Sequence, residues 1–286
     1  MAAALLQDQD FAALVDPGPG STIHALRQRL AAHGIRVSDL SAIFLTHIHL
    51  DHAGATGALV QENPDLKVYV HQRGAPHMAD PAVLLKSAGR LYGDQMGPLF
   101  GDFLPVPESN MVVLQGGEIL KPGPFELRVL YTPGHASHHV TYFETSNKVA
   151  FVGDTAGISI EGHPFILPAT PPPDISLELW NSSLDAISQL HAERLFLTHF
   201  GFSDSPERHL QTYREQLQHW SELSEEILFR AADEDAGMKS FVDSVAAEAS
   251  VTLSPEEVSH YVFNGALNLS WLGLVRYHRK RQLPKP

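Results

Sequence analysis

Short apolar runs separated by turn-forming residues organise the first part of the chain. Two such runs, Ala2–Leu6 and Phe11–Val15, enclose a polar turn and predict a pair of strands. The segment Ser21–His33 has the composition of a helix, with a serine at its start and Gly34 just past its end. Ala42–Leu45 is again apolar and predicts a buried strand. This alternation of strands and helices is typical of a layered α/β protein.

A second group of strands follows later in the chain. Before it, residues 72–110 have a mixed and mostly helical pattern, which we interpret as an inserted helical lid. Apolar runs bounded by turn residues then predict strands at Met111–Leu114, Phe125–Tyr131, Val140–Glu144, Lys148–Val152 and Arg194–Thr198. Helices are predicted at Ser176–His191 and Ser205–Arg230. We therefore expect helices that cover a pair of packed sheets.

The last part of the chain looks entirely helical. Thr252 or Ser254 is placed to cap a last helix that begins at Pro255. The apolar side chains of this part, such as Trp271, must pack either on the rest of the chain, where they would cap a pocket, or on a second subunit in a homodimer. We predict a main domain over residues 1–231 and a C-terminal helical extension over residues 232–286.

Composition and charge restrict the class of protein. The chain has 286 residues, which suits one large domain with an appendage, and it has no cysteine, so thiolate ligands are excluded. A net charge of −13 disfavours nucleic acid or an anionic membrane as a partner and leaves a small-molecule substrate as the expectation. The first residues lack the features of a signal peptide, and no apolar run is long enough to span a bilayer. We therefore expect a cytoplasmic protein.

Four potential metal ligands lie within six residues at the end of a predicted strand. The segment His47-Ile-His-Leu-Asp-His52 directly follows the apolar run that ends at Leu45. Alternation directs His47 and His49 to one side, whereas Asp51 and His52 lie where the chain turns. One tetrahedral site needs three or four protein ligands, so this segment can begin two sites. Without a cation, side chains packed this densely would repel each other or lack partners.

Three further strands each end in a residue that can bind metal. His135 follows Tyr131-Thr-Pro-Gly, Asp154 follows Phe151-Val-Gly, and His199 follows Leu195-Phe-Leu-Thr. Each of these polar residues comes after an apolar strand, as His47 does. We therefore expect four strand ends to bring their ligands to one edge of the sheets.

These motifs, THxHxDH followed by PGH, GD and TH, resemble the metallo-β-lactamase superfamily over about residues 11–202. The resemblance implies an αββα sandwich in residues 1–231, which would be the catalytic domain. It also implies two divalent metal ions, with zinc as the first expectation and iron or manganese compatible with nitrogen and oxygen ligands. The implied first metal site is His47, His49 and His135, the second is Asp51, His52 and His199, and Asp154 bridges the two.

Two residues outside this ligand set are expected to support it. Asp16 matches the aspartate that ends an early strand in the superfamily and lies beneath the site. Where relatives often have GHTPGH, this chain reads Gly134-His-Ala-Ser-His-His139. His139 falls at the second histidine of that pattern and His138 replaces a glycine. Two interpretations of His139 stay open: it orients a ligand or the substrate, or it is a packing residue of the next strand.

The all-His/Asp ligand set is similar to that of glyoxalase II-like enzymes and lactonases. It implies a hydrolase in which a hydroxide bridging two metal ions attacks a carboxylic ester, thioester or lactone, with Asp51 or Asp154 accepting the proton of the water. Apolar residues that either line the substrate pocket or form part of the core are Tyr92, Phe100 and Phe165. Three different functions also stay open: a persulfide-dioxygenase-like enzyme with one iron, a phosphodiesterase, and a non-catalytic sensor on the same fold.

Overall fold

The computed structural model describes residues 1–160 and 165–282, apart from the side chains of residues 263 and 264. Within these residues the first sheet has five strands in the order β1-β2-β3-β4-β5. They are Ala4–Asp8 (β1), Phe11–Val15 (β2), Ala42–Phe44 (β3), Lys67–His71 (β4) and Met111–Leu114 (β5). β1 and β2 form the predicted antiparallel hairpin, whereas β2 to β5 run parallel to one another.

The second sheet has six strands among the described residues, in the order β13-β12-β9-β8-β7-β6. They are Ile119–Leu120 (β6), Leu127–Tyr131 (β7), Val140–Glu144 (β8), Val149–Gly153 (β9), Arg194–Leu197 (β12) and Gly201–Ser203 (β13). β9 and β12 run parallel, so both deliver their carboxyl ends to the same edge. A separate two-stranded ribbon joins Ile158–Ser159 (β10) to Ile166–Leu167 (β11).

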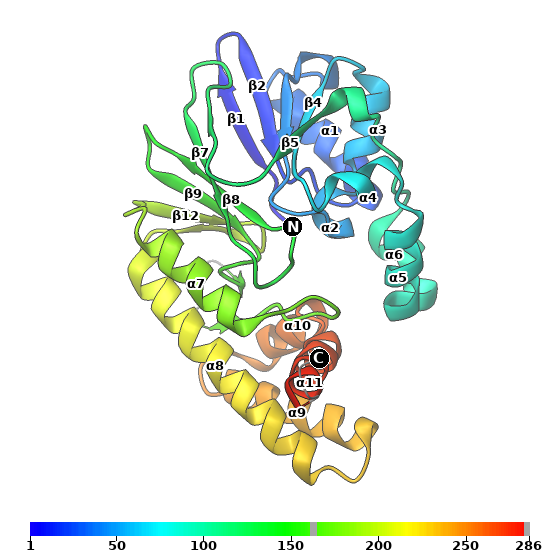
Figure 1. The fold of residues 1–286 in the computed structure, drawn as a ribbon, viewed down its shortest axis with the longest axis vertical. Coiled ribbons are helices and arrows are strands. Elements are labelled where there is room, and N and C mark those ends of the chain that lie inside the picture. The colour runs from blue at the N-terminus through cyan, green and yellow to red at the C-terminus, as the bar shows by residue number, and fades with distance from the viewer. Residues whose placement is uncertain (161–164, 283–286) are drawn as a thin grey trace.

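The two sheets pack face to face, and helices cover their outer faces (Figure 1). Phe44 of the first sheet and Tyr142 and Phe151 of the second lie in the core between the sheets. The covering helices are Ile23–Ala32 (α1) and Thr56–Glu62 (α3) on the first sheet, and Leu177–Ser188 (α7) and Pro206–Arg230 (α8) on the second. This arrangement confirms the αββα sandwich that the motifs implied.

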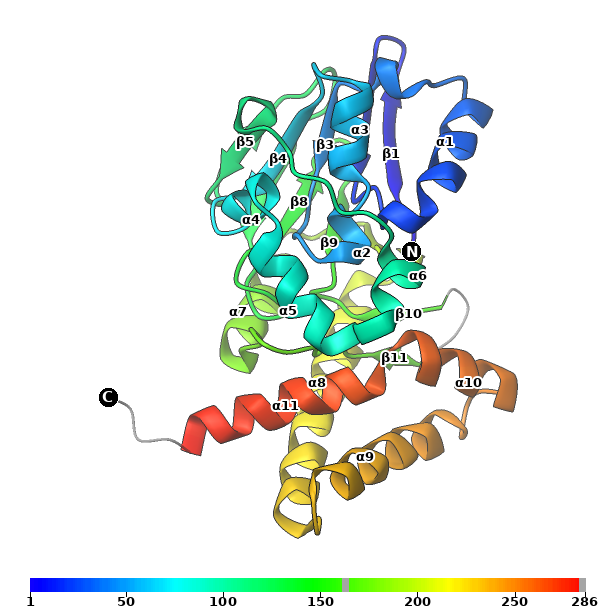
Figure 2. The same cartoon turned by 90° about the vertical axis from the view of Figure 1, so that its right-hand side faces the viewer.

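Two further groups of helices face each other across one side of the sandwich (Figure 2). The predicted lid contains Ala75–Ala79 (α4), Ala82–Tyr92 (α5) and Met96–Phe100 (α6). The C-terminal part contains Glu234–Ala249 (α9), Pro255–Asn264 (α10) and Leu267–Gln282 (α11). These last helices pack on the rest of the chain, because Phe241 and Trp271 share a core with Trp180 and Leu197. Within the described residues, no helix combines the length and the apolar character needed to cross a bilayer.

The structure corrects three expectations of the sequence analysis. Met111–Leu114 joins the first sheet, next to β4, and not the later group of strands. The short strands β6, β10, β11 and β13 were not predicted, because runs of two or three residues show no periodicity. The last helix is two helices, since Ala266 adopts φ 44° and turns the chain between α10 and α11. Ser254 caps α10 as predicted, with its hydroxyl accepting the N–H of Glu257.

Candidate metal centre

The predicted ligand segment follows β3 at the edge where the sheets present their strand ends. β3 ends at Phe44, and the short helix Leu50–Ala53 (α2) begins directly after His49. His47 and His52 are fully buried, while His49 and Asp51 are partly exposed toward a pocket. The segment therefore directs its four side chains to one point at the end of the sandwich.

The structure brings the first implied set together. The ligand atoms of His47, His49 and His135 all lie within 4.8 Å of one another. His135 Nε2 is 2.9 Å from His49 Nδ1. The Nδ1–H of His135 donates to the carbonyl of Ala169 at 2.8 Å, so its Nε2 carries the lone pair. In the absence of metal, Nδ1–H of His49 can donate to this lone pair, and a cation that displaced the proton would lie between two ring nitrogens.

The second implied set also converges. The ligand atoms of Asp51, His52 and His199 lie within 4.8 Å of one another. An oxygen of Asp51 is 3.4 Å from His199 Nε2 and 3.8 Å from His52 Nε2. His47, His52 and Asp154 form a third group within the same limit. The ligand atoms thus make one continuous cluster with two ends.

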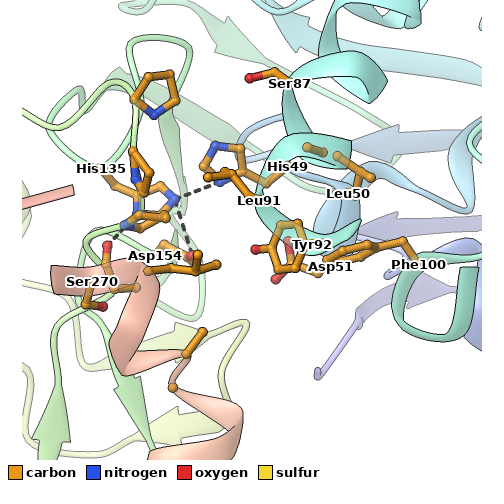
Figure 3. A pocket seen from close by; sticks show the side chains of 18 of the residues that line it. His49, Leu50, Asp51, Ser87, Leu91, Tyr92, Phe100, His135, Asp154 and Ser270 are labelled. Atoms are coloured by element: carbon orange, nitrogen blue, oxygen red, sulfur yellow. Dashed lines mark hydrogen bonds and ion pairs between the residues drawn. The ribbon is translucent and has the colours of Figure 1, made fainter. Parts of the chain in front are cut away.

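Asp154 stands between these two ends and offers one oxygen to each. Its Oδ2 is 3.4 Å from Nε2 of His135, in the first set. Its Oδ1 is 3.1 Å from Nε2 of His52 and 3.5 Å from Nε2 of His199, in the second set. Figure 3 shows Asp154 beside His135 at the base of the pocket.

Buried polar atoms without partners indicate what the cluster accommodates. His47 Nε2 is buried and has no hydrogen-bond partner, and His52 Nε2 and Asp154 Oδ1, also buried, face each other at 3.1 Å as an ion pair. Leaving a buried polar atom unsatisfied costs about 1–3 kcal/mol. All three lie in the ligand cluster, and imidazole nitrogens with carboxylate oxygens are the donors that divalent transition metals prefer. The residues present therefore fit divalent metal ions.

The electrostatics of the cluster agree with that fit. Burial alone would raise the pKa of Asp51, but the imidazoles of His52 and His199 outweigh it and hold the pKa below its ordinary value. The pKa of Asp154 is lowered in the same way, by His52 before His199. Burial and neighbouring imidazoles lower the pKa of His47, which keeps its ring neutral. Ionised carboxylates beside a neutral imidazole are protonation states that metal binding requires. His52 differs: burial would lower its pKa, but Asp154, Asp51 and Asp16 outweigh burial and raise it, so a metal bound there would displace a proton.

Asp16 fixes the base of the site from beneath. It follows β2 with φ 48°, a left-handed conformation that aspartate tolerates better than most residues. Its carboxylate accepts the Nδ1–H of His52 at 2.9 Å and the hydroxyls of Thr46 at 2.6 Å and Thr198 at 2.9 Å. With its Nδ1 proton engaged, His52 directs Nε2 into the ligand cluster. Each threonine immediately precedes a predicted ligand, His47 or His199, so Asp16 ties the segment after β3 to the segment after β12.

His139 contacts the backbone of the bridging position. The N–H of Asp154 donates to His139 Nε2 at 3.2 Å, and the other ring nitrogen lies 3.0 Å from the hydroxyl of Thr132. Gly153 makes this contact available, because a Cβ there would lie 2.5 Å from His139 Nε2. His138 is half-buried and its ring is stacked 6.0 Å from that of His47. These contacts favour the orienting interpretation of His139.

A pocket opens directly over the cluster, with a volume of about 160 Å³. Its floor includes His49, Asp51, His135, Asp154 and His199. Its walls come from three segments far apart in the sequence: Leu84, Ala88, Leu91, Tyr92 and Phe100 of the lid, Ala169 and Pro171–Pro173 of a loop, and Gly265, Ala266, Leu269 and Ser270 beside α11. No lysine or arginine belongs to this lining among the described residues.

The structure separates the three aromatic residues considered for the pocket. Tyr92 and Phe100 line it, and their rings pack edge to face at 4.8 Å. Phe165 does not line it, because its ring packs against Tyr261 in the core beneath the C-terminal helices. The residues beside α11 complete the wall, which agrees with the expectation that these helices cap a pocket. Sequence reasoning did not single out Thr46, Thr198 or the Ala169 carbonyl, although both threonines stand next to recognised ligands.

Comparison with known proteins agrees with this geometry. The model of the metallo-beta-lactamase superfamily matches residues 2–199, and the chain belongs to that superfamily. The fold is that of a metallo-beta-lactamase family protein of Thermus thermophilus, with a TM-score of 0.67, 24% identity, and coverage of 97% of this chain and 87% of that one.

Curated relatives match only part of their own length. One, named "probable metallo-hydrolase YqgX" in Bacillus subtilis, is 33% identical over 136 residues, which is 48% of this chain and 57% of the relative. Hydroxyacylglutathione hydrolase GloC of Haemophilus influenzae is 32% identical over 147 residues, which is 51% of this chain and 62% of the relative. The chain thus spans about three fifths of the length of these relatives.

Proposed function

We propose that this protein is a dinuclear metal-dependent hydrolase that cleaves a carboxylic ester, thioester or lactone with a compact apolar acyl group. One observation carries the proposal: the two oxygens of Asp154 face two different groups of ligands, His135 on one side and His52 with His199 on the other. A carboxylate that directs one oxygen to each group can bridge two ions only if both groups bind one. The names of the two relatives, a metallo-hydrolase and a thioester-type hydrolase, support the same class of reaction.

The residues divide the work of such a reaction. His47, His49 and His135 would hold one ion, Asp51, His52 and His199 the other, and Asp154 both. Two divalent ions supply Lewis acidity and water that is deprotonated near neutral pH. Asp51 and Asp154 stay ionised and can accept the proton of the attacking water. Asp16, His139 and the carbonyl of Ala169 hold the ligands in orientation.

The pocket supports a small, uncharged and apolar substrate group. Its walls are mostly leucine, alanine, proline and aromatic side chains with Ser87 and Ser270 among them, and within the described residues it has no cationic side chain to pair with an anionic group. A phosphodiester carries a negative charge that such a lining leaves unpaired, so a phosphodiesterase is disfavoured. Zinc stays the first expectation for the metal, and the nitrogen and oxygen ligands are also compatible with iron or manganese.

The second group of ligands argues against a dioxygenase and against a sensor. A dioxygenase with one iron needs a single site with open positions, and it gives no role to the convergence of Asp51, His52 and His199. A non-catalytic sensor needs neither a complete ligand set nor a pocket that opens onto it. Both observations favour a hydrolase.

The proposal is tested by replacing the bridging residue. In Asp154→Ala we expect metal retention to fall below one ion per chain and hydrolysis of p-nitrophenyl esters, thioesters and lactones to fall at least about 10³-fold. Asp185→Ala is the matched control, because this aspartate pairs with Arg214 on the outer surface of α7 and should leave both quantities unchanged. Full activity in Asp154→Ala would contradict the bridging role, and a wild-type protein with bound metal that cleaves none of these substrates would contradict the proposed function.

A further inference from the structure

The hydroxyl of Tyr92 is a polar group of the pocket that the proposed reaction has not yet used. Tyr92 is the last residue of α5 and belongs to the same lining as Asp51 and Asp154. Its ring is held edge to face against Phe100, which is buried in the core of the first sheet. Figure 3 shows the hydroxyl directed into the pocket, toward the side on which Asp154 lies.

This hydroxyl is available to a substrate. It forms no hydrogen bond with another residue in the part of the chain that the structure describes. The ordinary pKa of a tyrosine is about 10, so the phenol carries its proton at neutral pH. It is therefore a hydrogen-bond donor at the wall of the pocket and not an anionic metal ligand.

Hydrolysis of an alkyl ester is helped by such a donor at one particular atom, because an alkoxide is a strongly basic leaving group. A bond forms between the water oxygen and the carbonyl carbon, the bond from that carbon to the alcohol oxygen breaks, and the alcohol oxygen then needs a proton. In the proposed reaction the carboxylates of Asp51 and Asp154 act on the side of the water. Nδ1 of His47 faces the hydroxyl of Thr46 and Nδ1 of His135 faces the carbonyl of Ala169, so both nitrogens are already engaged.

We propose that Tyr92 is a catalytic residue whose hydroxyl donates its proton to the leaving oxygen of an alkyl ester or lactone. This assignment rests on the proposed hydrolase function and deepens it. As the carbon–oxygen bond breaks, the proton passes from Tyr92 to the alcohol, and the phenolate regains a proton from solvent at the open side of the pocket. The proton that the attacking water gives to a carboxylate returns to solvent. One ester and one water are thus converted into one acid and one alcohol.

The test compares two esters that share an acyl group and differ in the leaving group. The leaving group of an ethyl ester is ethoxide, a strong base that needs a proton. The leaving group of a p-nitrophenyl ester is p-nitrophenolate, a weak base that needs none. In Tyr92→Phe we expect kcat for the ethyl ester to fall about 10²-fold and kcat for the p-nitrophenyl ester to change less than about threefold. Because the ring and its packing on Phe100 remain, KM, metal content per chain and the thermal midpoint should stay at wild-type values.

A second tyrosine provides the control. The hydroxyl of Tyr277 on α11 donates to Glu178 outside the pocket, so Tyr277→Phe removes one hydroxyl without touching the site and should slow neither ester. Equal losses for both esters in Tyr92→Phe, or no loss for either, would overturn the assignment to the leaving oxygen and leave the hydrolase intact. A metal-loaded wild type that cleaves neither ester nor any thioester or lactone would overturn the proposed function and this assignment with it.

Discussion

Asp16 shows how one buried carboxylate can organise a whole centre. Its oxygens bind the backbone N–H and hydroxyl of Thr46, the ring of His52 and the hydroxyl of Thr198. Thr46 and His52 lie on the segment after β3 and Thr198 lies after β12, and each is adjacent to or is itself a proposed ligand. Asp16 is fully buried, so these hydrogen bonds are made away from competing water.

Removal of that charge should weaken metal binding without removing a ligand. Asp16→Asn keeps the shape of the side chain but offers His52 a neutral acceptor or a clashing amide, so the orientation and basicity of His52 are lost. We expect metal affinity to fall about 10- to 100-fold, measured by competition with a chromophoric chelator. Asp10→Asn, at the exposed turn of the first hairpin, is the control. An affinity for metal equal to wild type would contradict the supporting role.

At the residue scale, the sequence predicted what is encoded locally. The proposed ligands were found because each follows an apolar strand or stands in a dense motif. The supporting role of Thr198 was not predicted, because its hydrogen-bond partner, Asp16, is 182 positions away along the chain. Phe165 was wrongly grouped with the pocket, because an aromatic residue near Asp154 in sequence can point either to the site or to the core. Only the packing of α10 decides between these directions.

At the element scale, the hairpin between β8 and β9 is held by a buried carboxylate. The oxygens of Glu144 accept the backbone N–H groups of Ser146 and Asn147 and the side-chain amide of Asn147. Burial would raise the pKa of Glu144, but these hydrogen bonds outweigh it and leave the pKa below its ordinary value of 4.5. The ionised carboxylate thus closes the turn that positions β9 and, through it, Asp154.

This depressed pKa predicts a pH-dependent contribution to stability. Because the folded state lowers the pKa, the stabilisation is fully present above the unfolded value of 4.5 and is lost as the pH falls through the lower folded value. Glu144→Gln should lower the unfolding free energy of the metal-free protein by about 1–2 kcal/mol at pH 7. Denaturant titrations of wild type and variant should converge as the pH falls below the lowered folded pKa of Glu144. A difference that is independent of pH would contradict the role of the charge.

The wall that α11 contributes should limit the length of the acyl group. Leu269 is buried and lines the pocket opposite the lid. We compare p-nitrophenyl acetate with p-nitrophenyl butyrate, whose acyl group is two methylenes longer. In Leu269→Ala the ratio of kcat/KM for the butyrate to kcat/KM for the acetate should rise about tenfold. Leu272→Ala on the same helix is the control, since Leu272 is only partly buried and lies outside the pocket lining. An unchanged preference would show that this wall does not bound the acyl group.

Elements with a regular spacing of apolar residues were predicted to within a few residues of their ends. The break between α10 and α11 at Ala266 was not predicted. The sequence from Pro255 onward is helical by composition, but Gly265 packs so closely on Leu167 that a Cβ there would lie 2.8 Å from that side chain. The chain turns at Ala266 to keep this contact, and the turn places Leu269 and Ser270 at the pocket. The position of the wall that contains Leu269 and Ser270 therefore depends on tertiary packing, which no local sequence pattern predicts.

At the scale of the whole molecule, the C-terminal helices and the second sheet share one core. Trp220 of α8 packs against Phe241 of α9 with ring centroids 5.3 Å apart, and Phe241 packs against Trp271 of α11 at 5.7 Å. The same cluster continues to Leu195 and Leu197 of β12, close in sequence to the proposed ligand His199. A substitution that loosens the packing of these helices should therefore also disturb the position of His199.

A core substitution far from the metal tests this continuity. Trp271→Ala should lower the unfolding free energy of the metal-free protein by about 3–5 kcal/mol and keep a single transition, seen by far-UV dichroism and tryptophan fluorescence together. Phe229→Ala on α8 is the control, since that ring is 69% exposed and its loss should cost less than about 0.5 kcal/mol. A separate early transition confined to the C-terminal helices would show that they fold on their own.

The central claim is that the two ends of the ligand cluster each hold an ion. The most direct measurement is the number of zinc ions bound per chain when metal-free protein is titrated calorimetrically and the product is checked by elemental analysis. We expect about two ions per wild-type chain and about one in Asp51→Ala, which removes a ligand of the second group only. One ion per chain in both proteins would contradict the account, because Asp51, His52 and His199 would then converge without a metal to hold.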